Sequence, residues 1–220
     1  MGLKVIPTNI LKFAVDVNLD NFEQYAITIE DLLAREQSQF ESHVEEEKSK
    51  WPGQDIDEFF GMYENDYRRL SEVFPDLLRK SFFVACYSFL EHTLLDLCRY
   101  LQKKHKYTVE LSDLAEKGVF KARTYLKKVV GVDFPDRSAL WTDITNFSHI
   151  RNFIVHNNGQ LNKTKDADTV RLLVKQKKWI SIDAYECLQL TGDFYKEIIG
   201  GLRNFFEELL VALSKIQIPE

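Results

Sequence analysis

Hydrophobic residues recur along most of this chain at the spacing of an α-helix. Between residues 20 and 50, for example, Phe22, Ala26 and Ile29 follow one another at intervals of three or four, with polar residues between them. The pattern predicts an all-α bundle of about five to six helices. The helices are expected over residues 20–50, 54–74, 75–106, 112–131, 138–158 and 191–215.

Capping and turn-forming residues mark several of these boundaries. Pro75 occupies a position typical of the first turn of a helix, and the segment after it is apolar on more than one face, so we expect it to form the centre of the core. Ser112 is expected to begin the next helix and Gly131 to end it. Ser138 begins the following one, which the Asn-Asn-Gly run at 157–159 closes.

Two segments depart from the helical pattern. Residues 161–178 are rich in lysine and are expected to be irregular, whereas residues 179–190 alternate loosely and allow a short β-hairpin. There are no internal repeats, low-complexity tracts or long linkers. We therefore expect a single helical domain over residues 1–220.

The composition of the 220 residues, 45% hydrophobic and 29% charged, is that of an ordinary globular protein. A net charge of −5 argues against coating nucleic acid by bulk attraction, but the charge is unevenly distributed. Residues 1–60 contain 13 acidic and 5 basic side chains, whereas residues 111–180 contain 7 acidic and 13 basic ones. The basic part of the chain surrounds the candidate site described below.

No apolar stretch approaches the roughly 20 residues needed to cross a bilayer, and the first 17 residues lack the apolar core of a targeting signal. We expect no membrane association and a cytoplasmic location. Cys86, Cys98 and Cys187 show neither disulfide nor zinc-ligand spacing and are expected to be buried, reduced thiols. The sequence gives no indication of a metal or cofactor.

The helix expected over 138–158 carries the most informative pattern. One side, which must face inward, is apolar and consists of Ile144, Phe147, Ile150 and Ile154. The opposite side is polar and consists of Thr145, Ser148, His149, Asn152 and His156. From residue 144 to residue 162 the only formal charge is Arg151, which is unusual for a solvated helix face. A buried or interfacial polar site explains this face better than free solvent does.

Simpler interpretations of the two candidate residues remain open. Arg151 lies at the edge of the apolar side, where a guanidinium is costly unless it is paired, and an acidic core residue such as Glu91 can pair with it. A histidine in the last helical turn, such as His156, is favourable for the helix dipole alone. Together with Asn152, however, the two side chains can bind a phosphodiester and move its protons.

The string RNFIVHNNG at 151–159 resembles the R-x4-6-H motif of the HEPN superfamily, with a polar residue directly after the Arg and Asn and Gly after the His. Members of that superfamily likewise place the motif near the end of a late helix in an all-α bundle. They often have an earlier aromatic-rich helix, similar to residues 87–94 here. The resemblance covers roughly residues 75–213, which would be the HEPN-like core, and leaves the helices of residues 1–74 as an addition.

The resemblance implies a metal-independent endoribonuclease that acts as a homodimer, often in toxin–antitoxin or antiviral systems where a neutralising partner protein exists. Arg151 would stabilise the phosphorane, His156 would transfer protons, and Asn152 would orient His156 or the phosphate. Ser148, His149 and Asn157 would be supporting polar residues. Basic side chains downstream can attract RNA, although lysine runs are often merely solubilising: Lys163, Lys165, Arg171, Lys175, Lys177 and Lys178.

The alternative is a non-catalytic helical interaction or nucleotide-binding module, in which Arg151 and His156 only organise a dimer. A metal hydrolase is disfavoured because Glu91-His92 alone is no ligand set and no His-x-x-x-His spacing occurs.

Overall fold

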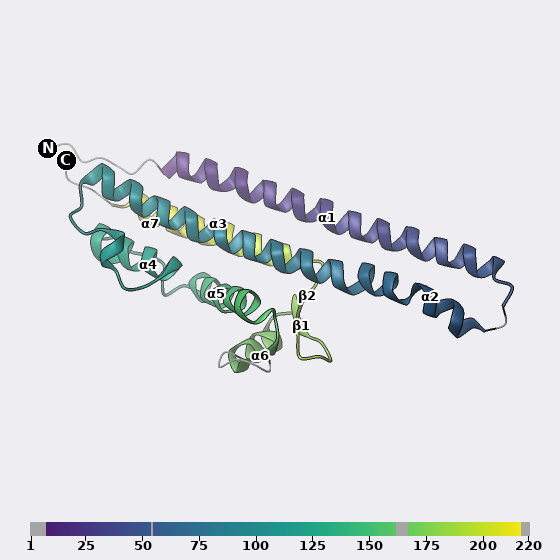
Figure 1. Ribbon diagram of the computed structural model, residues 1–220. Coiled ribbons are helices and arrows are strands. Elements are labelled where there is room, and N and C mark those ends of the chain that lie inside the picture. The colour runs from purple at the N-terminus through teal and green to yellow at the C-terminus, as the bar shows by residue number, and fades with distance from the viewer. Residues whose placement is uncertain (1–7, 54, 162–166, 217–220) are drawn as a thin grey trace.

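The structure, a computed structural model, describes residues 8–53, 55–161 and 167–216 (Figure 1). It is an all-α bundle with one short antiparallel hairpin, as predicted. The helices and strands are α1 (Thr8–Lys50), α2 (Ile56–Arg68), α3 (Phe74–His105), α4 (Gly118–Tyr125), α5 (Ala139–Asn157), α6 (Ala167–Gln176), β1 (Ile180–Ile182), β2 (Leu188–Leu190) and α7 (Phe194–Ser214). No described helix has both the length and the apolar character needed to span a membrane.

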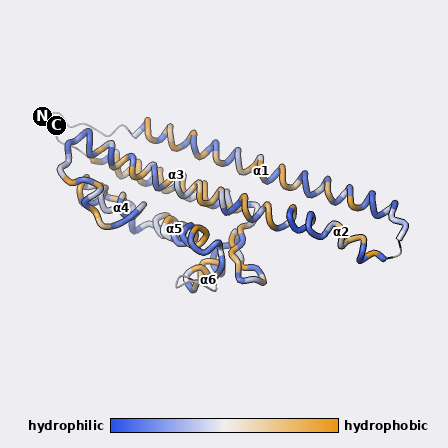
Figure 2. The backbone as a smooth tube through the Cα atoms, in the orientation of Figure 1, coloured by the Kyte–Doolittle hydropathy of each residue, from blue (hydrophilic) through white to orange (hydrophobic). Residues whose placement is uncertain are grey.

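The central element is α3, as the sequence predicted. Its buried residues Leu90, Leu94 and Leu101 are fully inaccessible, and they belong to the same hydrophobic cluster as Phe205 and Phe206 of α7. Hydrophobic positions recur along α3 and α1 between hydrophilic ones (Figure 2), and α3 contacts α1, α4, α5 and α7.

The first helix begins at Thr8, twelve residues before the predicted start at Asp20. Val15 and Leu19 lie in this extra portion and are buried in the core, because α1 packs along α7 and α3. Arg79 of α3 clamps α1 through a two-pronged ion pair with Glu30, at 2.8 and 2.7 Å, and also donates to the Leu190 carbonyl at 3.2 Å. One side chain thereby joins α1, α3 and the hairpin.

Pro75 lies in the first turn of α3, as predicted, but the expected break between the two helices is absent. The chain stays helical from Ile56 to His105, and a π-helical turn over Arg69–Val73 joins α2 directly to α3. Proline has no N–H, and its ring displaces the carbonyl one turn earlier. The wider π turn, in which the Phe74 N–H reaches the Arg69 carbonyl, accommodates that displacement without ending the helix.

The start of α4 also differs from the prediction. Ser112 lies in a 3₁₀ turn (Leu111–Asp113) that Glu110 and Asp113 cap reciprocally, and the α-helix begins only at Gly118. The predicted end is correct, since a π-helical turn over Leu126–Val130 extends α4 to Gly131, whose φ is 82°. A left-handed residue at this position is the usual helix terminator.

Residues 161–178 are not irregular throughout as predicted, because α6 occupies Ala167–Gln176. Val170 and Leu173 are buried one turn apart, while lysine and arginine occupy the outer face. The hairpin predicted for residues 179–190 is present, with Ile180 opposite Leu190 and Ile182 opposite Leu188. The last helix corresponds to α7 to within three residues at each end.

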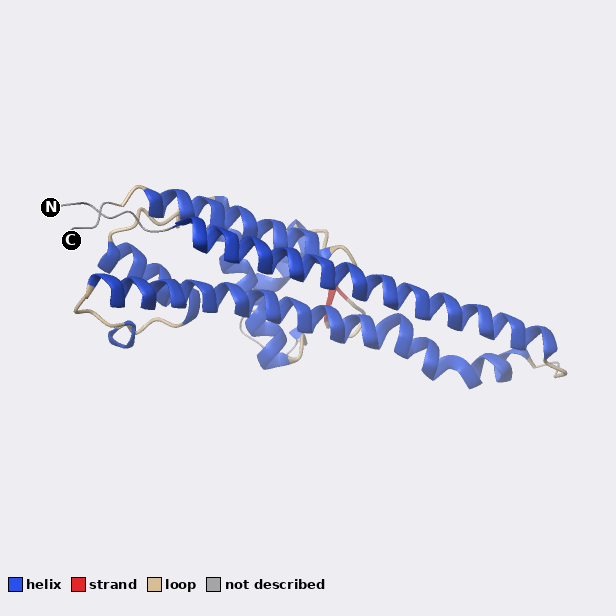
Figure 3. Ribbon diagram, turned by 90° about the horizontal axis from the view of Figure 1, so that it is seen from above, coloured by secondary structure: helices blue, strands red, loops and turns tan. Residues whose placement is uncertain are grey.

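The outer parts of α1 and α2 project beyond the rest of the bundle. Two views at right angles show residues 32–50 of α1 running beside α2 with no other helix around them (Figures 1 and 3). We call this pair of segments the arm.

Candidate functional site

The candidate residues lie in the second half of α5. Ser138 caps the start of this helix, where its Oγ accepts the Trp141 N–H at 3.2 Å, and Asn158 ends it with a φ of 50°. Both boundaries were predicted. Among the four residues expected to face inward, Ile154 is only half-buried, and Phe153 is buried in addition to them.

Lys80 of α3 lies close to Gly159, two residues after the end of α5. This lysine is only 8% exposed, and its Nζ donates to the Asp76 carboxylate at 2.7 Å. A Cβ on Gly159, whose φ is 75°, would lie 3.0 Å from the same Nζ, so glycine permits the close approach. The chain that leaves α5 after His156 therefore packs closely against α3.

Arg151 contacts three side chains. Its Nη1 donates to the Asn152 amide oxygen at 2.8 Å, its Nη2 lies 3.9 Å from the Glu91 carboxylate, and its Cζ lies 5.6 Å from the centre of the Tyr87 ring. The pairing with Glu91 confirms the simpler interpretation of the sequence. Arg151 nevertheless has unused donor capacity, because its buried Nε meets no hydrogen-bond acceptor among the described residues.

The ring under the guanidinium belongs to the protein core. Tyr87 is 4% exposed and shares a hydrogen bond with the buried Ser148 of α5. Burial raises the pKa of the Tyr87 phenol, and the bond from Ser148 offsets part of that rise. Ser148 thus lies beside the Tyr87 ring, over whose face the Arg151 guanidinium is placed.

The remaining polar residues of α5 differ in exposure. Asn152 and His156 are exposed, whereas His149 and Asn157 are half-buried. The face that the sequence marked as polar thus runs from a buried serine to a solvent-accessible histidine at the helix end. It presents a guanidinium, an amide and an imidazole, which together can bind an anion and exchange protons.

The four predicted RNA-binding side chains that the structure describes all lie on α6 or directly after it, and two of them are paired. Arg171 forms an ion pair with Glu186, and Lys177 lies 2.7 Å from the Asp143 carboxylate. Lys175 and Lys178 are exposed. Lys163 and Lys165 lie outside the described residues. The described part of this segment therefore offers less free positive charge than its composition suggests.

Two features of this region escaped the sequence analysis. Tyr87 was noted only as part of an aromatic-rich segment, although its position one turn before Glu91 places both on the side of α3 that faces α5. The amphipathic pattern of α6 was obscured by its lysines, yet Val170 and Leu173 were a usable signal. Across the described residues, no three His, Cys, Asp or Glu side chains lie close enough together to hold a metal ion.

Comparison with known proteins found no matching family model, no matching curated protein and no matching solved structure. The resemblance to the HEPN superfamily therefore stays a prediction that depends on the residues of this chain alone.

Proposed function

We propose that this protein is a metal-independent endoribonuclease that acts on cytoplasmic RNA through Arg151, Asn152 and His156. The observation that carries the proposal is the arrangement at the end of α5, where a half-buried guanidinium lies five residues before an exposed histidine. The adjoining helix surface contains no lysine or glutamate, although an ordinary solvent-exposed helix face would contain them.

The chemistry is transesterification. A histidine takes the proton of the ribose 2′-OH, the 2′ oxygen attacks phosphorus, and the bond from phosphorus to the 5′ oxygen breaks as a second acid donates a proton to the leaving oxygen. Arg151 stabilises the charge on the phosphorane oxygens, and Asn152 holds the guanidinium through its 2.8 Å bond. The products are a 2′,3′-cyclic phosphate and a 5′-OH.

One chain supplies one His156, so we propose that a second copy supplies the other across a two-fold axis. Apolar side chains near the site support a buried interface. Leu77 of α3 is 57% exposed and shares a cleft of about 670 Å³ with Ile154, while the adjoining Val155 is 51% exposed. Two His156 side chains within roughly 10 Å of each other would serve one phosphate.

The test is cleavage of a fluorescent single-stranded RNA in EDTA by purified protein. We expect cyclic-phosphate products from wild type, and loss of at least about a hundredfold in rate for His156→Ala and for Arg151→Ala. His43→Ala, which removes an exposed histidine from α1, is the matched control and should retain full activity. Activity that survives His156→Ala would overturn the assignment.

The contact with Glu91 favours a second candidate. A guanidinium already neutralised within one chain is also what a non-catalytic interaction or nucleotide-binding module would contain. A folded dimer that binds a nucleotide or a partner protein, such as a neutralising regulator, and leaves RNA intact would identify the protein as such a module.

A further inference from the structure

The arm has a small aromatic core of its own. Phe59 of α2 is 1% exposed, and its ring centre lies 5.5 Å from that of Trp51 and 5.2 Å from that of Tyr63. None of these rings belongs to the main hydrophobic cluster of the bundle. The arm therefore has its own packing and does not simply extend the core.

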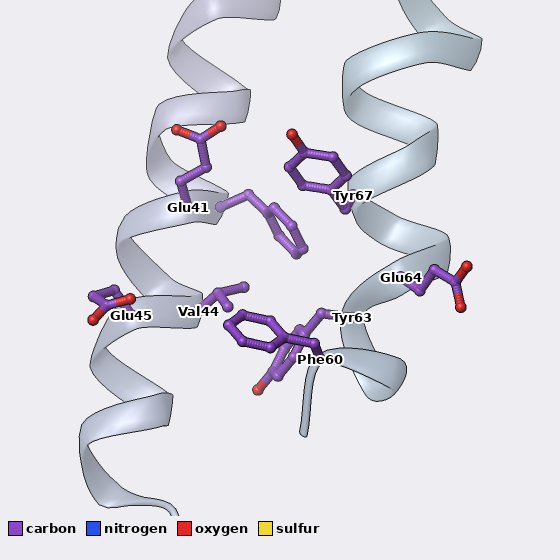
Figure 4. A pocket seen from close by; sticks show the side chains of 8 residues that line it. Glu41, Val44, Glu45, Phe60, Tyr63, Glu64 and Tyr67 are labelled. Atoms are coloured by element: carbon purple, nitrogen blue, oxygen red, sulfur yellow. The ribbon is translucent and has the colours of Figure 1, made fainter. Parts of the chain in front are cut away.

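An apolar cleft of about 440 Å³ lies beside this aromatic core, between α1 and α2. Val44 points into the space from α1, and Phe60, Tyr63 and Tyr67 point into it from α2 (Figure 4). Phe40 lines the cleft as well, with its ring 6.1 Å from that of Tyr63. Phe60 and Tyr67 remain 44% and 50% exposed. We call this space the arm cleft.

The charge around the arm cleft is negative. Its other lining residues are Glu41, Glu45 and Glu64, whose carboxylates form its rim and point away from the apolar space (Figure 4). Lys48 lies 3.6 Å from Glu45 and 5.5 Å from the Phe60 ring and offsets part of this charge. Over residues 32–68 there are ten acidic and four basic side chains.

We propose that the arm cleft binds a positively charged amphipathic helix of a partner protein. Large apolar side chains spaced three or four residues apart would fill the space between α1 and α2, and flanking lysines or arginines would meet the glutamates. The negative rim repels RNA phosphates and anionic lipids.

A second copy of this chain is a poorer occupant. Its own arm has the same negative charge, so that a two-fold contact between arms would oppose like charges. Its basic segment would make a head-to-tail contact, which propagates into filaments unless the rotation closes. A foreign cationic helix avoids both problems.

The test is fluorescence anisotropy with a labelled amphipathic peptide of about 18 residues, leucine on one face and lysine elsewhere. We expect saturable binding at micromolar concentrations that weakens with added salt. A peptide with glutamate in place of lysine, and one with serine in place of leucine, should bind at least about tenfold more weakly.

Protein variants distinguish binding in the arm cleft from non-specific attraction to the acidic surface. Phe60→Ser leaves the charge unchanged and should lower affinity at least about tenfold, whereas Phe13→Ser, at a residue 71% exposed near the other end of α1, should not. The double variant Glu41→Lys with Glu64→Lys should weaken binding by a similar factor. Glu46→Lys, on the opposite side of α1, should leave it nearly unchanged. Circular dichroism must show that each variant is folded.

The proposal would be overturned if the lysine and glutamate peptides bound with equal affinity, or if Phe60→Ser left the peptide affinity unchanged. A change in oligomeric state with Phe60→Ser would assign the cleft to a second copy and would overturn it too. None of these measurements involves RNA cleavage, so the result is independent of the proposed ribonuclease activity.

Discussion

Glu91 and Gly118 lie in direct contact, although 27 positions separate them in the chain. A Cβ on Gly118 would stand 2.9 Å from Oε2 of Glu91, the same oxygen that lies 3.9 Å from Arg151. Gly118 is the first residue of α4, and the partial positive charge of a helix N-terminus attracts a carboxylate. The Glu91 carboxylate therefore lies between the start of α4 and the Arg151 guanidinium.

Gly118→Ala should destabilise the protein for two reasons. The φ of 56° is unfavourable for alanine by about 1–2 kcal/mol, and the new methyl group displaces the Glu91 carboxylate. Gly131→Ala is the matched control, because its φ is 82° and nothing lies within 4 Å of the added Cβ. Urea unfolding should show a larger loss for Gly118→Ala, and the excess should vanish in a Glu91→Ala background. Equal losses would contradict the contact.

Arg79→Lys should cost about 1–3 kcal/mol of unfolding free energy, because lysine cannot reproduce both bonds to Glu30 and the bond to the Leu190 carbonyl. Arg99→Lys should change stability by less than about 0.5 kcal/mol, since the Arg99–Asp96 pair is largely exposed. Chemical denaturation of the two variants side by side checks the difference. A loss as small for Arg79→Lys as for Arg99→Lys would contradict the joining role of the clamp.

The order of the helices could be predicted from hydrophobic spacing, but the way in which consecutive helices are connected could not. Pro75 fitted a helix start after a break, whereas a π turn carries the helix into it and the proline is buried. The amphipathic pattern of α6 was present but outweighed by its lysines. Residues 8–19 contain exposed Ile10 and Phe13, so their pattern did not separate an inner from an outer face.

The thiols should differ sharply in reactivity. Burial raises the pKa of Cys98 to about 12 and that of Cys86 further, so neither forms thiolate at neutral pH. Cys187 is half-buried at the hairpin. Titration of the native protein with DTNB at pH 8 should modify Cys187 alone, and addition of guanidinium should release the other two. Rapid modification of all three without denaturant would contradict the burial, and Cys187→Ser should abolish the native reaction.

The hairpin should lose stability in acid through Asp183. Burial raises the pKa of this carboxyl, but hydrogen bonds from the Cys187 and Tyr185 N–H groups and the Gln189 amide outweigh it, so the pKa lies below its ordinary 3.8. The stabilisation is therefore complete well above pH 3.8 and disappears as the pH falls through the lower folded-state value.

Asp183→Asn tests this dependence. It should be less stable than wild type at pH 7, and the two proteins should converge as the pH falls below 3.8. Asp96→Asn, at an exposed carboxylate of α3, should follow the wild-type curve throughout. A gap between Asp183→Asn and wild type that stays constant down to acid pH would show that the carboxylate charge plays no part.

Arg151 and its neighbours could be found from the sequence because a single charge in an uncharged helix face is visible as a pattern. The partner Glu91 could be proposed for the same reason. The contact of Glu91 with α4 could not, since it depends on where a helix begins, and that boundary was predicted six residues too early. His156 is exposed in the single chain, and no pattern within one chain reports whether a second copy covers it.

Glu91→Gln should reveal what Arg151 does. Glutamine keeps the size of the side chain and removes the charge that competes with phosphate for the guanidinium. If Arg151 binds RNA as proposed, affinity for a 2′-O-methyl RNA, which cannot be cleaved by transesterification, should rise about three- to tenfold. Asp66→Asn removes a charge on α2 that forms an exposed ion pair with Arg69, and it should leave RNA affinity unchanged. The opposite result is an unchanged RNA affinity together with a lower unfolding free energy in the Glu91→Gln variant. That result would make Arg151 a structural residue and favour the non-catalytic module.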